Sequence, residues 1–272
     1  MKKRLCILIA LVLALTACAQ APTLPQTGTP ETTTPPTSVP ETTVPETTVP
    51  PEATVPPTTA PLHSELYLED CSLEQLLEYW DEVVLDVEYT EGDGDFTLVQ
   101  KWLAPISCRI LGAPTDEDLQ VLETFFAQLN GIPGFPGIRM AEEYEFTNLS
   151  LSFLGPEDFR NGFSDVVHGE DAWGAVQFWY WTDTNEIYDA RIGYRTDIPQ
   201  TERNSILLEE IVNGLGLNDS LLREDSIVYQ HSNDNLELSD VDLLILKLLF
   251  NPAIRPGMNA DECHEVLAEL YY

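Results

Sequence analysis

The residues best placed to do chemistry lie in one segment, 205–230, which reads SILLEEIVNGLGLNDSLLREDSIVYQ. Apolar side chains recur there at helical spacing, so we expect a helix over about 200–215. Glu209 and Asn213 are four residues apart and therefore share one helical face, and Asp219 follows shortly after the helix. Carboxylate and amide oxygens are ligands that calcium, manganese and magnesium prefer. The spacing therefore indicates a candidate metal site.

An ordinary amphipathic helix would show the same residues. Such a helix needs a polar face toward solvent, and Glu209, Glu210 and Asn213 are adequate residues for it. Gly216 would then simply end the helix in a left-handed conformation. Short motif matches have a high false-positive risk, so for the helix alone a solvent-exposed polar face is the simpler interpretation.

The same segment resembles the active-site helix of the zincin metallopeptidases. That helix reads H-E-x-x-H and continues x-x-G-x-x-H in metzincins, where the histidines bind zinc and the glutamate is the general base. The frame here is Glu209-Glu210-x-x-Asn213-x-x-Gly216-x-x-Asp219. The glutamate and the glycine are present, but other residues occupy all three histidine positions. An amide is a poor zinc ligand, so the resemblance implies a zincin-like fold without zinc-peptidase chemistry.

Two neighbouring segments extend the resemblance. Ser226-Ile227-Val228-Tyr229 is similar to the metzincin turn S-I-M-x-Y, with Val228 in place of the methionine. More closely, LLEEIVNGLGLNDS, DSIVY and LSDVDLLILKLLFNPAIRPGM resemble a family of bacterial lipoproteins known as domain of unknown function 2927. The resemblance covers roughly residues 97–258 and is most specific after residue 200. Because the family has no established function, it implies a fold and little chemistry.

We expect an α+β domain with zincin-like architecture, in which helices cover a mixed, mostly antiparallel sheet and the helix at about 200–215 packs behind it. Strand patterns lie at 146–154, 172–182 and 186–195, and residues 183–185 join the last two. The signals that predict the starts of four further helices are at Ser72, Thr115, Ser239 and Asn259.

The first 18 residues, MKKRLCILIALVLALTAC, have the features of a bacterial lipoprotein signal peptide. A positive start precedes an apolar stretch that is short for a membrane span. Leu15-Thr16-Ala17-Cys18 resembles a lipobox, in which Cys18 is lipidated and begins the mature chain. We therefore expect acyl chains to anchor the protein to the outer face of the cytoplasmic membrane, or within the periplasm or outer membrane if the envelope has two membranes.

Residues 19–62 consist almost entirely of Pro, Thr, Glu, Val and Ala, with PETT repeated at Pro30, Pro40 and Pro45. Proline removes backbone donors and few apolar side chains are available for a core, so we expect a disordered, extended tether. At about 3.1 Å per residue its reach is on the order of 130 Å. The single globular domain is then 63–272.

The charge balance limits the partners. The chain has 46 acidic and 13 basic residues, a net charge of −33. Nucleic acid and anionic lipid headgroups are therefore poor partners, whereas cations, basic proteins and peptides, and neutral cell-wall polymers remain open. Excess charge is also a general means of keeping a protein soluble.

Cysteine and aromatic residues give weaker signals. Cys71, Cys108 and Cys263 are an odd, widely spaced set that allows at most one disulfide. Trp179 and Trp181 point to one face of an expected strand, where they could stack on a sugar or a peptide. The alternative is a strand that is simply buried on one face, because aromatic residues favour strands and cores.

Three hypotheses follow. The first, which we prefer because every histidine of the frame is replaced, is a lipid-anchored extracytoplasmic domain that binds an unknown ligand, needs no cofactor and is not an enzyme. The second is a metal-dependent hydrolase, in which Glu209, Asn213 and Asp219 hold calcium, manganese, magnesium or zinc and Glu210 is the base. The third is a solute- or cell-wall-binding lipoprotein that uses the aromatic strand.

Overall fold

The computed structural model describes residues 66–85, 98–167, 172–231 and 234–271. The predicted signal peptide 1–18 with Cys18, and the predicted tether 19–62, lie outside the described residues. Within the described ranges, no helix has the length and apolar character needed to cross a membrane.

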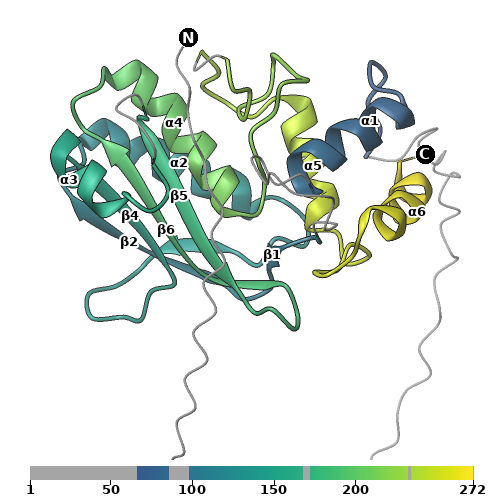
Figure 1. The fold of residues 1–272 in the computed structure, drawn as a ribbon, viewed down its shortest axis with the longest axis horizontal. Helices are drawn as coiled ribbons and strands as arrows, with labels where there is room; N and C mark the ends of the chain where they lie inside the picture. Colours follow the sequence, from purple (N-terminus) through teal and green to yellow (C-terminus); the bar gives the residue numbers. More distant parts are fainter. Residues whose placement is uncertain (1–65, 86–97, 168–171, 232–233, 272) are drawn as a thin grey trace, which may run out of the picture. The chain divides into compact units, whose positions relative to one another are not determined.

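The described residues form a mixed α/β domain around a six-stranded sheet (Figure 1). The helices are α1 (Leu73–Trp80), its π-helical continuation η1 (Asp81–Leu85), α2 (Asp116–Asn130), α3 (Pro156–Gly162), α4 (Gln200–Gly214), α5 (Asp240–Leu249) and α6 (Ala260–Leu270). The strands are β1 (Lys101–Trp102), β2 (Ile106–Gly112), β3 (Ile138–Met140), β4 (Leu149–Leu154), β5 (Gly174–Tyr180) and β6 (Glu186–Arg195).

Local sequence signals determine where four helices begin. A capping box opens α1, α2, α5 and α6. In each, the N-cap side chain accepts a hydrogen bond from the backbone N–H three residues later, and the side chain of that later residue accepts one from the N-cap backbone N–H. The predictions at Ser72, Thr115, Ser239 and Asn259 are therefore confirmed. The short helix α3, which starts with Pro156 after an uncapped glycine, was not predicted.

The sheet is mostly parallel, so the prediction of a mostly antiparallel sheet is wrong. β4 runs parallel to both β2 and β6, β3 runs parallel to β2, and β1 runs parallel to β6. Among the strands that the structure describes, only β5 and β6 pair antiparallel. Alternation of apolar and polar residues predicts a strand but not its direction. Here α2 leads from β2 to a parallel neighbour, and β5 lets the chain reverse before β6.

Helices cover both faces of the sheet. α4 packs on one face so closely that a Cβ on Gly214 would lie 3.1 Å from the Ile192 side chain of β6. On the same face the Tyr194 hydroxyl donates to the Leu207 carbonyl, 3.3 Å away. On the other face a Cβ on Gly193 would lie 2.3 Å from the Phe163 ring, just after α3. The larger of the two buried hydrophobic clusters lies on the α4 face, and the smaller one lies around α3.

The remaining helices α1, α5 and α6 form a separate group beside α4 (Figure 1). A buried chain of hydrogen bonds joins α1 to α5: Tyr79 donates to Ser226 Oγ at 2.8 Å, and Ser226 donates to Asp242 at 2.5 Å. Asp242 also accepts from the Ile227 amide at 3.0 Å. Hydrogen bonds thus join the DSIVY and LSDVD segments, which carry part of the family resemblance.

Gly216 ends the central helix as predicted. It has a φ of +109°, and α4 stops two residues earlier, at Gly214. A Cβ at Gly216 would lie only 2.2 Å from the Gln100 carbonyl oxygen, so both the conformation and the close approach require glycine. The chain can therefore turn back along the helix and bring Asp219 toward it.

Candidate functional site

Helix α4 is buried on all sides over its second half. Glu209 is 1% exposed, Glu210 is 3% exposed and Asn213 is 1% exposed. The interpretation of these residues as a solvent-exposed face is therefore wrong. The physical reason is packing by segments outside the helix: β5 lies against Glu210, α2 is joined to the helix through Asp118, and Asp219 returns to Asn213.

Asn213 and Asp219 are brought together, as the spacing of the motif frame implies. The Asn213 side-chain nitrogen donates to a carboxylate oxygen of Asp219 at 2.8 Å, and Asp219 is itself only 4% exposed. An ionised carboxylate can only accept hydrogen bonds, so the amide nitrogen, not the amide oxygen, faces Asp219. Glu209 lies one helical turn before Asn213 on the same face.

Glu210 lies on a different face, against the sheet. A Cβ on Gly174 of β5 would lie 2.4 Å from the Glu210 carboxylate and 2.6 Å from the Ile206 side chain. Gly174 therefore leaves the space that Glu210 occupies, a role that the sequence did not reveal. Burial raises the pKa of Tyr194 well above its usual range, and the charge of nearby Glu210 raises it further.

The frame contains the hydrogen-bonded pair Asn213 and Asp219 and two further buried glutamates, Glu209 and Glu210. Among the described residues, no three Asp, Glu, His or Cys side chains gather in a way that could hold a metal ion. A hydrogen bond joins two of the proposed ligands, Asn213 and Asp219. The predicted general base, Glu210, is directed toward β5.

Hydrogen bonds join residues 218–221, which follow α4, to η1. Glu82 accepts from the Ser220 hydroxyl at 2.6 Å and from the Leu221 amide at 2.9 Å. The Asn218 amide donates to the Val83 carbonyl at 2.8 Å. Sequence reasoning did not identify Glu82, because a π-helical continuation of α1 has no simple sequence signature. These bonds hold Asp219 in place beside Asn213.

The buried Asp242 has a structural role next to this site. Burial raises its pKa, and hydrogen bonds from Ser226, Ile227 and Ser239 act in the opposite direction. All of these partners donate to the same carboxylate. The carboxylate therefore serves as a shared acceptor that joins the DSIVY turn to the start of α5.

The aromatic strand has its two tryptophans outside the core. Trp181 is 54% exposed and stacks on Tyr188, with ring centroids 4.2 Å apart. Trp179 is half-buried, and the Arg191 guanidinium lies 5.8 Å from its ring centroid. Phe178, which points the other way, is buried. The strand is thus buried on one face while Trp181 stays accessible for stacking.

The three domain cysteines, Cys71, Cys108 and Cys263, are free and buried.

Comparison with known proteins gives a family and no function. No curated protein matches the chain. A family model described as a protein of unknown function, DUF2927, matches residues 73–269. This range is wider than the resemblance read from the sequence and includes every described helix and strand except the last residue of α6, Leu270. The chain therefore belongs to the DUF2927 family.

Proposed function

We propose that the protein is a lipid-anchored extracytoplasmic domain whose zincin-like scaffold binds a ligand and does not carry out zinc-peptidase chemistry. The Asn213–Asp219 hydrogen bond of 2.8 Å is the observation that carries this proposal. In the zincin frame both positions would be metal ligands. Here the Asn213 amide nitrogen donates to one Asp219 oxygen, and an amide nitrogen that carries two hydrogens has no lone pair available for an ion.

The arrangement around α4 supports the scaffold part of the proposal. The helix that carries the frame follows directly on the β5–β6 hairpin and packs on both strands. Gly216 turns the chain so that Asp219 returns to Asn213, which is the task that the glycine has in the metzincin frame. This course of the chain supports the proposal of a zincin-like scaffold.

The anchoring part of the proposal is supported by the sequence alone. A short apolar stretch after three basic residues ends at Leu15-Thr16-Ala17-Cys18, and a Pro/Thr-rich segment separates it from the domain. Two or more acyl chains on one cysteine would provide stable anchoring without a transmembrane helix.

A peptidase assay tests the non-catalytic part. The mature chain, made with Cys18→Ala so that it is soluble, would be incubated with denatured casein and a quenched fluorescent peptide library, with zinc, calcium or manganese added. We expect the Cys18→Ala chain to show no hydrolysis above the background measured with Glu210→Gln. The exposed-surface control Glu265→Gln should give the same background. Hydrolysis that Glu210→Gln abolishes and Glu265→Gln preserves would overturn the proposal.

A metal-dependent hydrolase is the second candidate, and one observation favours it. Glu209, Glu210 and Asp219 are at most 4% exposed and lie within a short stretch of chain. Carboxylate oxygens are ligands that calcium, manganese and magnesium prefer, and Asp219 lies within hydrogen-bonding distance of Asn213 in the same frame. The two candidates differ in whether the folded domain binds an ion stoichiometrically.

A further inference from the structure

One edge of the sheet is covered over only part of its length. β3 pairs with β2 from Ile106 to Cys108 and then ends at Met140, whereas β4 pairs with β2 as far as Gly112. The second half of β2 therefore has a partner strand on one side only. Such an edge offers main-chain groups to another extended chain.

The hydrogen bonds show which main-chain groups face that open side. Ile106 donates to the Gly137 carbonyl at 2.8 Å, and Cys108 accepts from the Ala141 amide at 2.8 Å, so both direct their main chain toward β3. Ser107 accepts from the Asn148 amide at 3.1 Å, on the β4 side. By the same alternation, the Ile110 N–H and C=O point to the β3 side, beyond the end of β3. No described residue forms a hydrogen bond with the Ile110 main chain on that side.

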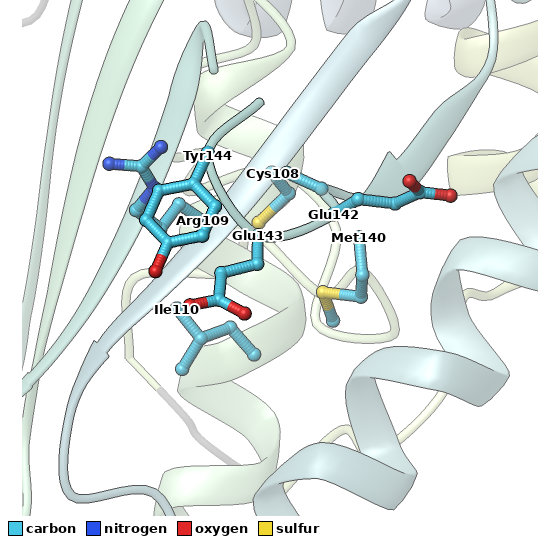
Figure 2. Close-up of a pocket in the computed structure, with 8 residues that line it drawn as sticks. Cys108, Arg109, Ile110, Met140, Glu142, Glu143 and Tyr144 are labelled. Carbon is cyan, nitrogen blue, oxygen red and sulfur yellow. The ribbon is translucent and has the colours of Figure 1, made fainter. Parts of the chain in front are cut away.

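A pocket of about 470 Å³ lies at this open edge (Figure 2). Cys108, Ile110 and Met140 provide its apolar surface, and the loop that follows β3 provides a polar wall with Glu143 and Tyr144. Figure 2 shows the Glu143 carboxylate directed toward Ile110, whereas the Glu142 carboxylate points away from this group. The pocket thus combines an unpaired strand edge, an apolar surface, one inward-facing negative charge and the Arg109 side chain, whose guanidinium donates to the Glu145 carbonyl.

The loop that forms the wall is held in a fixed conformation. Tyr144 has a φ of +68°, which is unfavourable for a tyrosine, and its side chain is 91% exposed. Glu145 forms an ion pair with Arg139 and accepts from the Glu142 amide at 3.0 Å. Arg109 of β2 donates to the Glu145 carbonyl at 2.8 Å. A strained residue kept in place by such contacts is typical of preformed binding sites.

The negative charge at the pocket favours a basic partner. Glu143 faces the open edge, and the whole chain has a net charge of −33. A second copy of the chain would bring the same excess of negative charge to the edge, so pairing between copies is opposed by repulsion. A partner segment with basic side chains is attracted instead.

We propose that the open edge of β2 at Ile110 binds an extended, basic peptide segment of a partner protein by strand addition. The Ile110 N–H and C=O would pair with the peptide main chain, and a Lys or Arg side chain would meet Glu143. The side chains of the peptide that point to the pocket would contact Ile110 and Met140. This inference uses neither α4 nor the lipid anchor, so it stands or falls independently of the function proposed above.

Hydrogen exchange at single amides tests the edge itself. In the soluble Cys18→Ala chain, we expect the Ile110 amide to exchange much faster than those of Arg109 and Leu111, which face β4. Equal protection of all three amides in a dilute monomer would overturn the proposal. So would Ile110 protection that grows with protein concentration together with dimer formation, because the occupant would then be a second copy.

Peptide binding tests the occupant. The probe is a fluorescent peptide of four Lys-Val repeats, compared with four Glu-Val repeats and with a Lys-Val peptide N-methylated at alternate residues. We expect saturable binding of the first peptide alone, with slower hydrogen exchange of the Ile110 amide in the complex.

Variants of the loop test the charge. Glu143→Gln should weaken binding roughly threefold or more, and the matched control Glu142→Gln should have a smaller effect. Binding that leaves Ile110 exchange unchanged, equal binding of the N-methylated peptide, or no saturable binding would each overturn the proposal.

Discussion

The side chain of Asn213 acts as a hydrogen-bond donor inside the domain. A histidine at this position would present a nitrogen lone pair to an ion, whereas the asparagine amide donates to Asp219 at 2.8 Å. Both residues are at most 4% exposed, so this bond forms where water cannot replace it. A hydrogen bond to a buried charged group is worth more than one at the surface.

Asn213→Ala should therefore destabilise the fold, because it leaves the Asp219 carboxylate buried without this donor. We expect a loss of about 1–3 kcal/mol in the free energy of unfolding, measured by urea denaturation. The control is Asn161→Ala at an exposed position near the end of α3, which should change stability by no more than about 0.5 kcal/mol. Equal stability of Asn213→Ala and the wild type would show that the pair is not an important contact.

At this scale the sequence predicts which residues come together better than it predicts their surroundings. The motif frame correctly indicates that Asp219 comes back to Asn213, since the spacing and Gly216 determine the course of the chain. It does not indicate that Glu209 and Glu210 are buried. Their burial depends on segments far away in the sequence, such as Gly174 on β5, which provides the space for Glu210.

At the scale of elements, a buried ion pair joins α2 to α4. Arg203 donates to Asp118 at 2.8 Å, and the two side chains are 5% and 0% exposed. Burial alone would raise the pKa of Asp118, but hydrogen bonds from Arg203, Thr115 and Gln200 outweigh it and lower the pKa below its usual value. The pair therefore favours the folded state whenever Asp118 is ionised.

Asp118→Asn should cost about 3 kcal/mol or more at pH 7, because it leaves the Arg203 guanidinium buried without a counter-charge. The folded pKa is depressed, so this contribution is present above about pH 4 and is lost as the pH falls further. The difference between wild type and variant should consequently shrink on acidification. Urea denaturation at pH 7 and pH 3.5 measures it, with the exposed Asp116→Asn as control. A difference that does not depend on pH would contradict this account.

The elements themselves divide into those that local sequence determines and those that it does not. Capping boxes predict the starts of α1, α2, α5 and α6, because the signal and the structure lie within four residues. The direction of β4 beside β2 and β6 is set by contacts across tens of residues. Strand patterns are the same for both directions, which is why the sheet was predicted as mostly antiparallel.

At the scale of the whole molecule, charge works against the compact state. The chain carries a net charge of −33, so its like charges repel one another more strongly when the domain is folded. Raising NaCl from 20 mM to 500 mM should screen this repulsion and raise the thermal midpoint, measured by differential scanning fluorimetry. A midpoint that falls or stays constant would show that local ion pairs outweigh the net repulsion.

Under the proposed lipid anchoring, the position of the protein in the cell depends on Cys18. Cys18→Ser should prevent lipidation and move the chain from the membrane fraction to the soluble extracytoplasmic fraction. Membrane fractionation and labelling with a fatty-acid analogue measure this change. Cys6→Ser, within the apolar stretch of the leader, is the matched control and should remain labelled and membrane-bound. Unchanged membrane association of Cys18→Ser would contradict lipid anchoring at this residue.

The central claim is that the α4 frame is a binding scaffold and not a metal centre, and metal content tests it most directly. The soluble Cys18→Ala chain would be purified without chelators, analysed by plasma mass spectrometry and then heated with added zinc, calcium or manganese. We predict far less than one ion per chain and an unchanged thermal midpoint, since an ion bound to the folded state would raise it. A stoichiometric ion that is lost in Asp219→Asn would contradict the claim and favour the metal-dependent hydrolase.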